Sequence, residues 1–456
     1  MTHTTASSSR LLERRRAGVL MHLSCRPAAL GRGGRAFVDW LAQAGFTIWQ
    51  ILPVGPTGSD GSPYWGRSDA AGNADLIDPE EMPAQASSEF HAFVAASRDW
   101  LDDYARFEVL SALHGGAPWW QWPAAHRNRD VAALERLEHE HAAAIHDIKA
   151  RQFAFAWQWH RLREYAGARG VHLFGDLPFY VAPDSAETWA RRAQFQLDDD
   201  GRPRAVAGVP PDYFSEKGQL WGNPLYDWDA MRGDGFAYWR YRVRRQLERV
   251  ELLRLDHFRA LAAHWAVPAG APDARAGVWK RTPGRALLRA LRNEFGGLPL
   301  VAEDLGVITP DVVDLRQGFA LPGMRGLQFA FDGSSDNPHL PHMHARDCVV
   351  YTGTHDNDTA LGWYRSLDAD TARRIDFFFG LTAGAMPEAL VRAALGSVGV
   401  LAVVPIQDVL GLASEARFNT PGTVQGNWSW RLPLAALTTE LAQRSLVLNR
   451  IYGRVP

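Results

Sequence analysis

Eight short apolar segments recur along the 456-residue chain, and each is nearly continuous rather than alternating with polar residues. Strands that are buried on both faces of a parallel sheet have this character. The candidate strands are residues 18–23, 46–54, 170–181, 251–258, 298–306, 323–331, 347–356 and 400–410. Their apolar character predicts a parallel sheet whose two faces are both covered by other parts of the protein.

Segments in which apolar residues recur at helical spacing lie between several of these strands. The clearest are residues 35–45, 236–250, 284–295 and 309–319. The last begins with Thr309 and Pro310, an N-cap residue followed by proline at the first helical position. Buried strands that alternate with helices predict an α/β fold, a (β/α)8 TIM barrel.

Two connections are too long to be simple crossovers between neighbouring strands. Residues 55–169, after the second candidate strand, are predicted to be a largely helical insertion. Residues 182–250, after the third, are predicted to be a loop-rich insertion. The chain shows no internal repeat and no low-complexity linker. We therefore expect residues 1–456 to form a single elaborated (β/α)8 domain.

Composition and charge narrow the class of protein. The chain is 46% hydrophobic and 22% charged, which is typical of a soluble globular protein, and its net charge of -2 gives no reason to expect a nucleic-acid partner. Two cysteines cannot build a disulfide framework. The polar N-terminal segment is not a secretory signal, and no apolar stretch is long enough to span a membrane. A cytoplasmic protein is expected.

Aromatic residues are abundant, with 18 tryptophans, 11 tyrosines and 21 phenylalanines. Composition alone favours an aromatic-rich core as the explanation. The alternative is a set of flat apolar faces against which sugar rings stack, because tryptophan and tyrosine also keep a polar group beside the ring.

Carboxylates follow four of the candidate strands. Asp176 lies near the end of the third, Asp256 at the end of the fourth, Glu303 and Asp304 at the fifth, and Asp356 at the seventh. A barrel enzyme builds its active site from the C-terminal ends of several strands. One such aspartate is explained by a helix N-cap, but several on strands that a barrel brings together predict a site.

Paired carboxylates beside a cation are what retaining glycoside chemistry requires. In this interpretation Asp256 stays ionised and attacks the anomeric carbon, while Glu303 donates its proton to the departing oxygen and needs a raised pKa. Arg254 precedes Asp256 by two residues, so it points the same way along a strand and helps to keep that carboxylate ionised. Asp356 would stabilise positive charge in the transition state.

Long stretches of the chain resemble the amylomaltases, the 4-α-glucanotransferases of glycoside hydrolase family 77. They include LRLDHFR (253–259), LVAEDLGVITPDV (300–312) and VVYTGTHDND (349–358), and further matches lie at 51–64, 174–190, 208–228, 327–342 and 405–431. The resemblance implies that Asp256 is the nucleophile, Glu303 the general acid/base and Asp356 the transition-state stabiliser. It implies transfer of an α-1,4-glucan segment to the 4-hydroxyl of an acceptor glucan, by retaining double displacement.

The resemblance also implies which residues bind sugar. Those around the sugar next to the scissile bond are Tyr64, Asp176, Arg254 and His355; Tyr213 lies in a loop that covers the acceptor side of the cleft, and Asn419 and Trp428 belong to a further family motif. The implied substrates are maltooligosaccharides and other α-1,4-glucans, with no metal and no organic cofactor. The sequence leaves open whether the protein is a monomer or a homodimer.

The chain departs from the family pattern at two places near the expected site. Residues 24–37 form a shorter loop than usual, and residues 65–73 read WGRSDAAGN where the family usually has QSFSAFAGN. Because the three carboxylates are in place, we expect these departures to alter donor subsites and chain-length preference rather than the type of reaction.

Two other functions remain as alternatives. One is an α-1,4-glucan hydrolase with weak transfer, and the other is a non-catalytic glucan-binding protein, against which the three carboxylates argue. The stretch 137–147 is rich in histidine and glutamate but lacks HExxH spacing. It is interpreted as a solvated helix face rather than a metal site.

Overall fold

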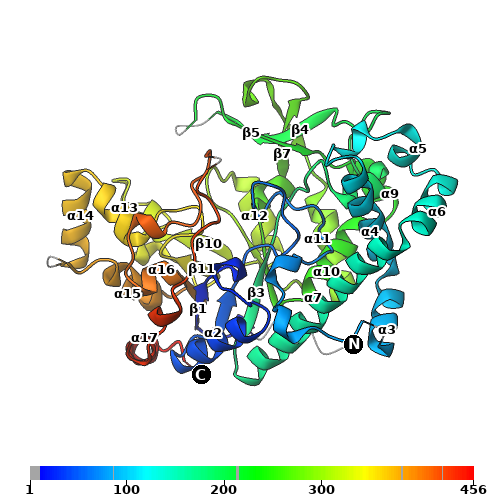
Figure 1. The fold of residues 1–456 in the computed structure, drawn as a ribbon. Helices are drawn as coiled ribbons and strands as arrows, with labels where there is room; N and C mark the ends of the chain where they lie inside the picture. The colour runs from blue at the N-terminus through cyan, green and yellow to red at the C-terminus, as the bar shows by residue number, and fades with distance from the viewer. Residues whose placement is uncertain (1–10, 86, 212–214, 382–383, 424, 456) are drawn as a thin grey trace.

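The computed structural model describes residues 11–85, 87–211, 215–381, 384–423 and 425–455. At its centre lies a sheet of eight parallel strands in the order β10-β11-β12-β1-β2-β3-β6-β9 (Figure 1). The strands are β1 (Arg16–Leu20), β2 (Ile48–Gln50), β3 (His172–Leu177), β6 (Leu252–Leu255), β9 (Leu300–Ala302), β10 (Gly323–Gly326), β11 (Cys348–Tyr351) and β12 (Leu401–Pro405). All eight predicted strands are confirmed. Asp256, Glu303 and Asp356 follow the strands that precede them, whereas Asp176 lies within β3.

The two edges of this sheet, β9 and β10, meet and bring the barrel nearly to closure. The backbone N–H of Ala302 donates to the carbonyl of Pro322, with 2.8 Å between the atoms. Asp304 accepts a hydrogen bond from the backbone N–H of Met324 at 2.6 Å. A Cβ at Gly323 would overlap the Asp304 carboxylate, so glycine is needed where the two strands approach. Asp304 therefore belongs to the barrel closure.

Helices surround the sheet, and the four predicted ones are confirmed. They are α2 (Arg32–Gln43), α10 (Ala237–Leu247), α11 (Gly284–Phe295) and α12 (Pro310–Gly318). Thr309 is the N-cap of α12, as predicted, but its side chain makes no capping hydrogen bond. Its hydroxyl donates instead to the Asp311 carboxylate at 2.5 Å and accepts from Arg259, so another partner occupies the oxygen that would cap the helix.

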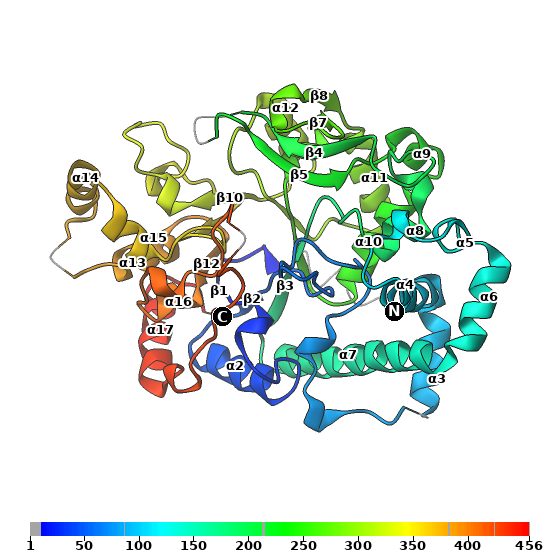
Figure 2. The ribbon, with the colours of Figure 1, turned by 45° about the horizontal axis from the view of Figure 1, so that its top comes forward.

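The first insertion, between β2 and β3, is largely helical, as predicted. Its helices are α3 (Ser88–Ala96), α4 (Arg98–Leu113), α5 (Ala124–Arg127), α6 (Val131–Glu140) and α7 (Ala142–Ala168). The 27-residue helix α7 runs along the flank of the barrel and leads back into β3 (Figure 2). The histidine- and glutamate-rich stretch 137–147 lies on α6 and the start of α7, and its members are mostly exposed.

The second insertion is less loop-rich than predicted, because it contributes to a second sheet. Before α10 it forms α8 (Ala186–Ala190), β4 (Ala205–Val209), β5 (Gln219–Pro224) and α9 (Trp228–Gly233), and β7 (Ala263–Pro268) and β8 (Val278–Arg281) follow β6. These four strands pair antiparallel in the order β5-β4-β7-β8. The prediction missed the sheet because β4 pairs with β7, which lies beyond the next barrel strand.

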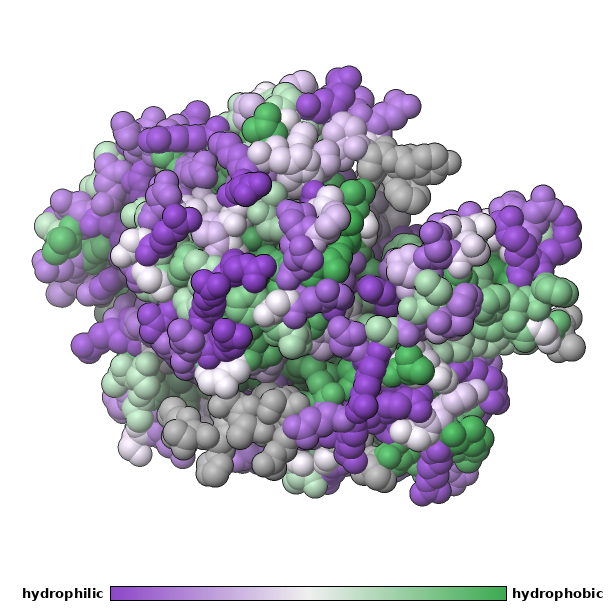
Figure 3. All heavy atoms as spheres, turned by 180° about the vertical axis from the view of Figure 1, so that it is seen from behind, coloured by the Kyte–Doolittle hydropathy of each residue, from purple (hydrophilic) through white to green (hydrophobic). Residues whose placement is uncertain are grey.

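Most of the aromatic residues belong to the core, as composition favoured. Trp49, Trp119, Trp189 and Trp239 are each at most 1% exposed. Seen from behind, the surface is covered by hydrophilic side chains with apolar patches between them (Figure 3). Within the described part of the chain, no helix combines the length and the apolar character that crossing a membrane requires.

Candidate active site

Arg254 joins two of the predicted carboxylates. It is the third residue of β6, and Asp256 follows directly after that strand. Its guanidinium lies 2.8 Å from Asp256 Oδ1 and 2.7 Å from Asp176 Oδ2, and its side chain is 6% exposed. Burial alone would lower the pKa of Arg254, but Asp176 and Asp256 raise it well above its ordinary value. The arginine is therefore a fixed positive charge between the two aspartates.

Asp176, on β3, is held from two sides. Besides the contact with Arg254, its Oδ2 accepts a hydrogen bond from the Tyr64 hydroxyl at 2.6 Å. Burial raises the pKa of Asp176, and Arg254 opposes that rise. Its second oxygen, Oδ1, is buried and has no hydrogen-bond partner within the described part of the chain. This leaves a free acceptor beside the other site residues.

Glu303 lies directly after β9 and is held by backbone donors. Its Oε2 accepts from the N–H of His257 at 2.8 Å, and its Oε1 accepts from the N–H of Leu305 at 3.0 Å. The pKa of Glu303 is raised to about 7: burial is the largest cause and Asp256 adds to it, whereas Arg254 and the two N–H groups oppose the rise. The raised pKa that the sequence interpretation required is therefore present.

The backbone at His257 is bent in a way that the sequence does not reveal. Its φ of 49° lies in the left-handed region, which residues other than glycine seldom adopt. This bend follows Asp256 and accompanies the hydrogen bond from His257 to Glu303. One local turn thus connects the segments that carry both carboxylates.

Asp356, in the loop after β11, is the third predicted carboxylate. Asn419 Nδ2 donates to Asp356 Oδ1 at 2.6 Å, and His355 Nε2 lies 3.3 Å from the same oxygen. The His355 ring stacks on Tyr64, with 5.1 Å between centroids and 13° between planes. Through Tyr64 and Asp176, these contacts reach Arg254 and Asp256.

Trp428 completes an aromatic group beside this loop. Its ring centroid lies 6.1 Å from that of Tyr64 and 6.2 Å from that of His355. The backbone N–H of Trp428 donates to the carbonyl of Phe418 at 2.8 Å, and the Trp428 ring meets the Phe418 ring edge to face. The residue has a positive φ of 62°, so its orientation is held by these contacts rather than by backbone preference.

The β4–β5 hairpin reaches the same site. Trp221, on β5, meets the ring of His257 edge to face with 4.7 Å between centroids. The sequence interpretation did not single out Trp221, and the only signal was its place in the family-like stretch 208–228. Tyr213, which was predicted to lie in a loop that covers the acceptor side of the cleft, lies outside the described residues. The structure brings together the other nine predicted site residues.

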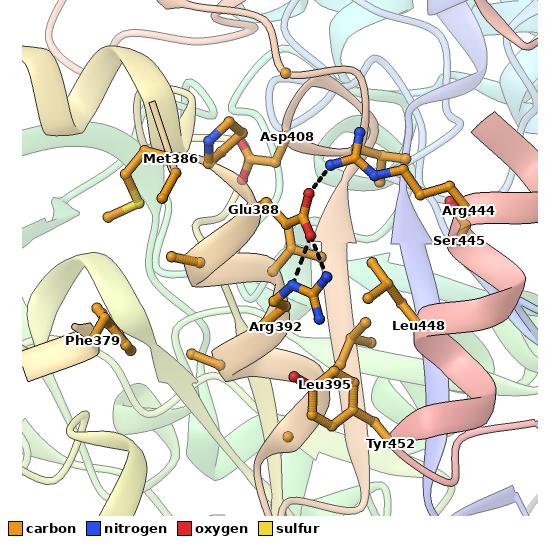
Figure 4. Close-up of a pocket in the computed structure, with 18 of the residues that line it drawn as sticks. Phe379, Met386, Glu388, Arg392, Leu395, Asp408, Arg444, Ser445, Leu448 and Tyr452 are labelled. Carbon is orange, nitrogen blue, oxygen red and sulfur yellow. Dashed lines mark hydrogen bonds and ion pairs between the residues drawn. The ribbon is translucent and has the colours of Figure 1, made fainter. Parts of the chain in front are cut away.

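A hollow of about 960 Å³ lies away from these residues, beside α15 (Glu388–Gly396) and α17 (Thr439–Ile451). Three of its charged groups are paired with one another, since Glu388 contacts both Arg392 and Arg444 (Figure 4). The fourth, Asp408, accepts hydrogen bonds from the Thr352 hydroxyl and the Ala360 N–H. None of the predicted site residues lines it.

Nor do the described residues contain a group of three or more His, Cys, Asp or Glu that could hold a metal ion. The strand-end carboxylates therefore remain the candidate active site.

The family model for 4-alpha-glucanotransferase matches residues 28–87 and 81–437, which is most of the chain. The chain belongs to this family. A 4-alpha-glucanotransferase from Thermus thermophilus is 43% identical over 484 residues, covering 94% of this chain and 96% of the relative. One from Synechocystis is 39% identical over 503 residues, covering 97% and 99%.

Solved structures of family members share the fold. An amylomaltase from Streptococcus agalactiae in complex with acarbose superposes with a TM-score of 0.92 at 30% identity, covering 97% of this chain and all of that one. Amylomaltase from Corynebacterium glutamicum has a TM-score of 0.70 at 20% identity, covering 99% of this chain and 76% of that one, which supports the fold alone. The (β/α)8 prediction is confirmed.

Proposed function

We propose that this family member is a hexosyltransferase that moves segments of α-1,4-glucans between maltooligosaccharides and other glucans. The observation that carries the proposal is the contrast between two carboxylates beside Arg254. Asp256 contacts the guanidinium directly, whereas Glu303 is buried with a pKa of about 7. One group is suited to attack as an anion and the other to donate a proton.

In the first half of the proposed reaction, Asp256 attacks the anomeric carbon of the donor. Its Oδ1 is held by Arg254, so Oδ2 is the oxygen that forms the new bond. Glu303 gives its proton to the departing glycosidic oxygen, and the reducing-end fragment leaves. The product of this half is a β-linked glycosyl-enzyme on Asp256 and an ionised Glu303.

In the second half, Glu303 takes the proton of an acceptor's 4-hydroxyl. The acceptor oxygen displaces Asp256, which leaves as a carboxylate, and an α-1,4 bond forms again. The two inversions restore the original configuration. Water competes with the acceptor at this step, so transfer depends on sugar binding and water exclusion beside the β4–β5 hairpin.

The remaining predicted residues have proposed binding roles. Tyr64 stacks on the sugar next to the scissile bond. Asp176 Oδ1 accepts a hydrogen bond from a hydroxyl group of that sugar, which would give this buried oxygen its missing partner. Asp356 stabilises the positive charge of the transition state and is oriented by Asn419 and His355. Tyr213 and Trp428 contact further sugars.

Broader features of the proposal concern the ligand, the compartment and the assembly. A relative of this chain was solved with acarbose, and we propose that this cleft binds the same compound. We propose that the protein works in the cytoplasm as a monomer or a homodimer. No metal or organic cofactor takes part in the proposed steps.

Incubation with pure maltotriose tests the proposal against its alternatives. A transferase is expected to release glucose and build a ladder of longer oligomers, because the enzyme-bound segment goes to another sugar. Breakdown without longer products would identify a hydrolase, and no change in the sugar would identify a binding protein. Either of these outcomes would contradict transfer.

A further inference from the structure

The segment that follows Tyr64 is held between α8 and α10. The N–H of Ala186 donates to the carbonyl of Arg67 at 2.9 Å. The Ser68 hydroxyl donates to the Glu187 carboxylate at 2.7 Å. This segment belongs to residues 65–73, and these contacts attach it to α8.

Asp69, in the middle of that segment, contacts a fully buried arginine of α10. Arg242 Nε lies 2.5 Å from Asp69 Oδ2; the arginine side chain is 0% exposed and the aspartate side chain 15%. Burial alone would lower the pKa of Arg242, but Asp69 contributes to raising it above its ordinary value. The family sequence usually has alanine where this chain has Asp69, so the ion pair accompanies that departure.

The other nitrogens of Arg242 hold the loop after β3. Nη2 donates to the carbonyl of Pro178 at 2.8 Å, and Nη1 donates to the carbonyl of Phe179 at 2.9 Å. Pro178 stands two residues beyond Asp176. One guanidinium therefore joins the loop that carries Tyr64 to the loop that begins at the end of the Asp176 strand.

A small enclosed cavity lies between these two loops. Its volume is about 20 Å³, and its walls include Tyr64, Asp69, Asp176 and Pro178. Tyr64 and Asp176, which both belong to its walls, are hydrogen-bonded to each other at 2.6 Å. Because Asp69 and Tyr64 lie in one short segment and Arg242 also binds the loop after β3, displacement of Asp69 would displace Tyr64 relative to Asp176.

We propose that Asp69 and Arg242 are positioning residues that fix Tyr64 against Asp176 at the sugar next to the scissile bond. This inference deepens the proposed function and rests on it. Neither residue contacts the reacting atoms; both act through the Tyr64–Asp176 hydrogen bond. In this proposal, the Asp69–Arg242 ion pair is what holds residues 65–73, and with them Tyr64, in place at the donor subsite.

A double-mutant cycle tests the inference with Asp69→Asn, Tyr64→Phe and the pair combined. The measured quantities are kcat/KM for glucose release from maltotriose and the Kd for acarbose. Asp69→Asn keeps the shape of the side chain but removes its charge, and we expect it to lower kcat/KM by about tenfold to a hundredfold and to weaken acarbose binding. The fold-decrease in kcat/KM of the double variant is expected to be smaller than the product of the two single fold-decreases, by a factor of more than about three.

Glu251→Gln is the matched control. Glu251 lies 2.5 Å from Arg163, with both side chains mostly buried, and it immediately precedes β6 at the end opposite Asp256. This substitution also removes the charge of a carboxylate in an ion pair. We expect it to lower Tm while leaving kcat/KM and the acarbose Kd within about twofold of the original, with effects that multiply with those of Tyr64→Phe.

Multiplicative effects of Asp69→Asn and Tyr64→Phe would overturn the inference, as would an Asp69→Asn protein with unchanged kcat/KM. If Asp69→Asn does not fold, Gln246→Ala replaces it, because Gln246 Nε2 donates to the carbonyl of Asp69 at 3.1 Å. The same coupling with Tyr64→Phe is then expected, and its absence would be equally decisive. Hydrolysis also releases glucose, so failure of the transfer proposal would appear separately, as glucose release without longer products.

Discussion

At the scale of single residues, two carboxylates near one guanidinium have different surroundings. Asp256 lies against Arg254, whereas the Glu303 carboxylate is buried, accepts hydrogen bonds from two backbone N–H groups and has a pKa of about 7. The sequence predicted which carboxylates meet, because each directly follows a buried strand. It did not predict the N–H donors of His257 and Leu305, because their positions depend on a left-handed bend and on the approach of segments far apart in the chain.

Activity is expected to fall as pH rises through about 7, with Glu303 as the group that titrates. The first step requires protonated Glu303, and deprotonation removes the acid that the leaving oxygen needs. The measurement is kcat/KM for maltotriose across pH. A profile that stays flat from pH 6 to about pH 9 would contradict the role of Glu303 as the acid.

Glu303→Gln is expected to lower kcat/KM by about 10²–10⁴-fold, because the amide cannot donate an acidic proton. The same substitution is expected to raise the free energy of unfolding at pH 8. Since burial raises the pKa of folded Glu303, the folded state binds more protons than the unfolded state between its ordinary pKa and about 7, and stability is lost as pH rises through that window. The gain is on the order of 3 kcal/mol.

Urea unfolding at pH 8 and at pH 4 measures this effect on stability. The difference between the variant and the original protein should shrink at pH 4, where the folded glutamate keeps its proton. Equal differences at both values would show that the glutamate is not held in a site that disfavours its ionised form.

At the scale of elements, the barrel strands were predictable because burial on both faces requires continuous apolar runs. The second sheet could not be predicted in this way. Its strand β8 is exposed along its length, and β4 pairs with β7 although the barrel strand β6 lies between them in the sequence. The closure of the barrel was likewise hidden in the sequence. It depends on Asp304, next to the proposed acid, bonding to Met324 rather than to substrate.

Gly323→Ala is expected to destabilise this closure by about 1–3 kcal/mol, because the added methyl group overlaps the Asp304 carboxylate between β9 and β10. Gly167→Ala in α7 is the control, since among the described residues no atom outside its own helix backbone and chain neighbours lies within 4 Å of the position of its added Cβ. The control should be neutral or slightly stabilising. Urea unfolding midpoints compare the two, and equal midpoints would contradict the closure.

At the scale of the whole molecule, a continuous apolar core runs from the barrel into the helical insertion. One cluster of buried residues includes Val19 and Val403 of the barrel together with Leu101 and Phe107 of α4. We therefore propose that the chain is a single domain, as the absence of linkers led us to expect. The insertions pack on the barrel, apart from a small separate cluster of Phe90, Ala150 and Phe153 between α3 and α7.

Thermal unfolding followed by calorimetry is expected to show one transition for the full chain, because the shared core couples the insertions to the barrel. Limited proteolysis is expected to release no stable fragment that corresponds to residues 55–169. Two separated transitions, or a fragment that keeps its helical circular dichroism, would contradict the single domain.

The central claim, that Asp256 attacks the donor while Glu303 handles the proton, is tested most directly by trapping the glycosyl-enzyme. Glu303→Gln is incubated with α-maltotriosyl fluoride, whose leaving group needs no acid, and is then analysed by mass spectrometry with peptide mapping. The intermediate should accumulate because no base activates an acceptor. The predicted result is one maltotriosyl group bound to Asp256. A maltotriosyl group on another residue, or catalytic release of fluoride with no adduct, would contradict it.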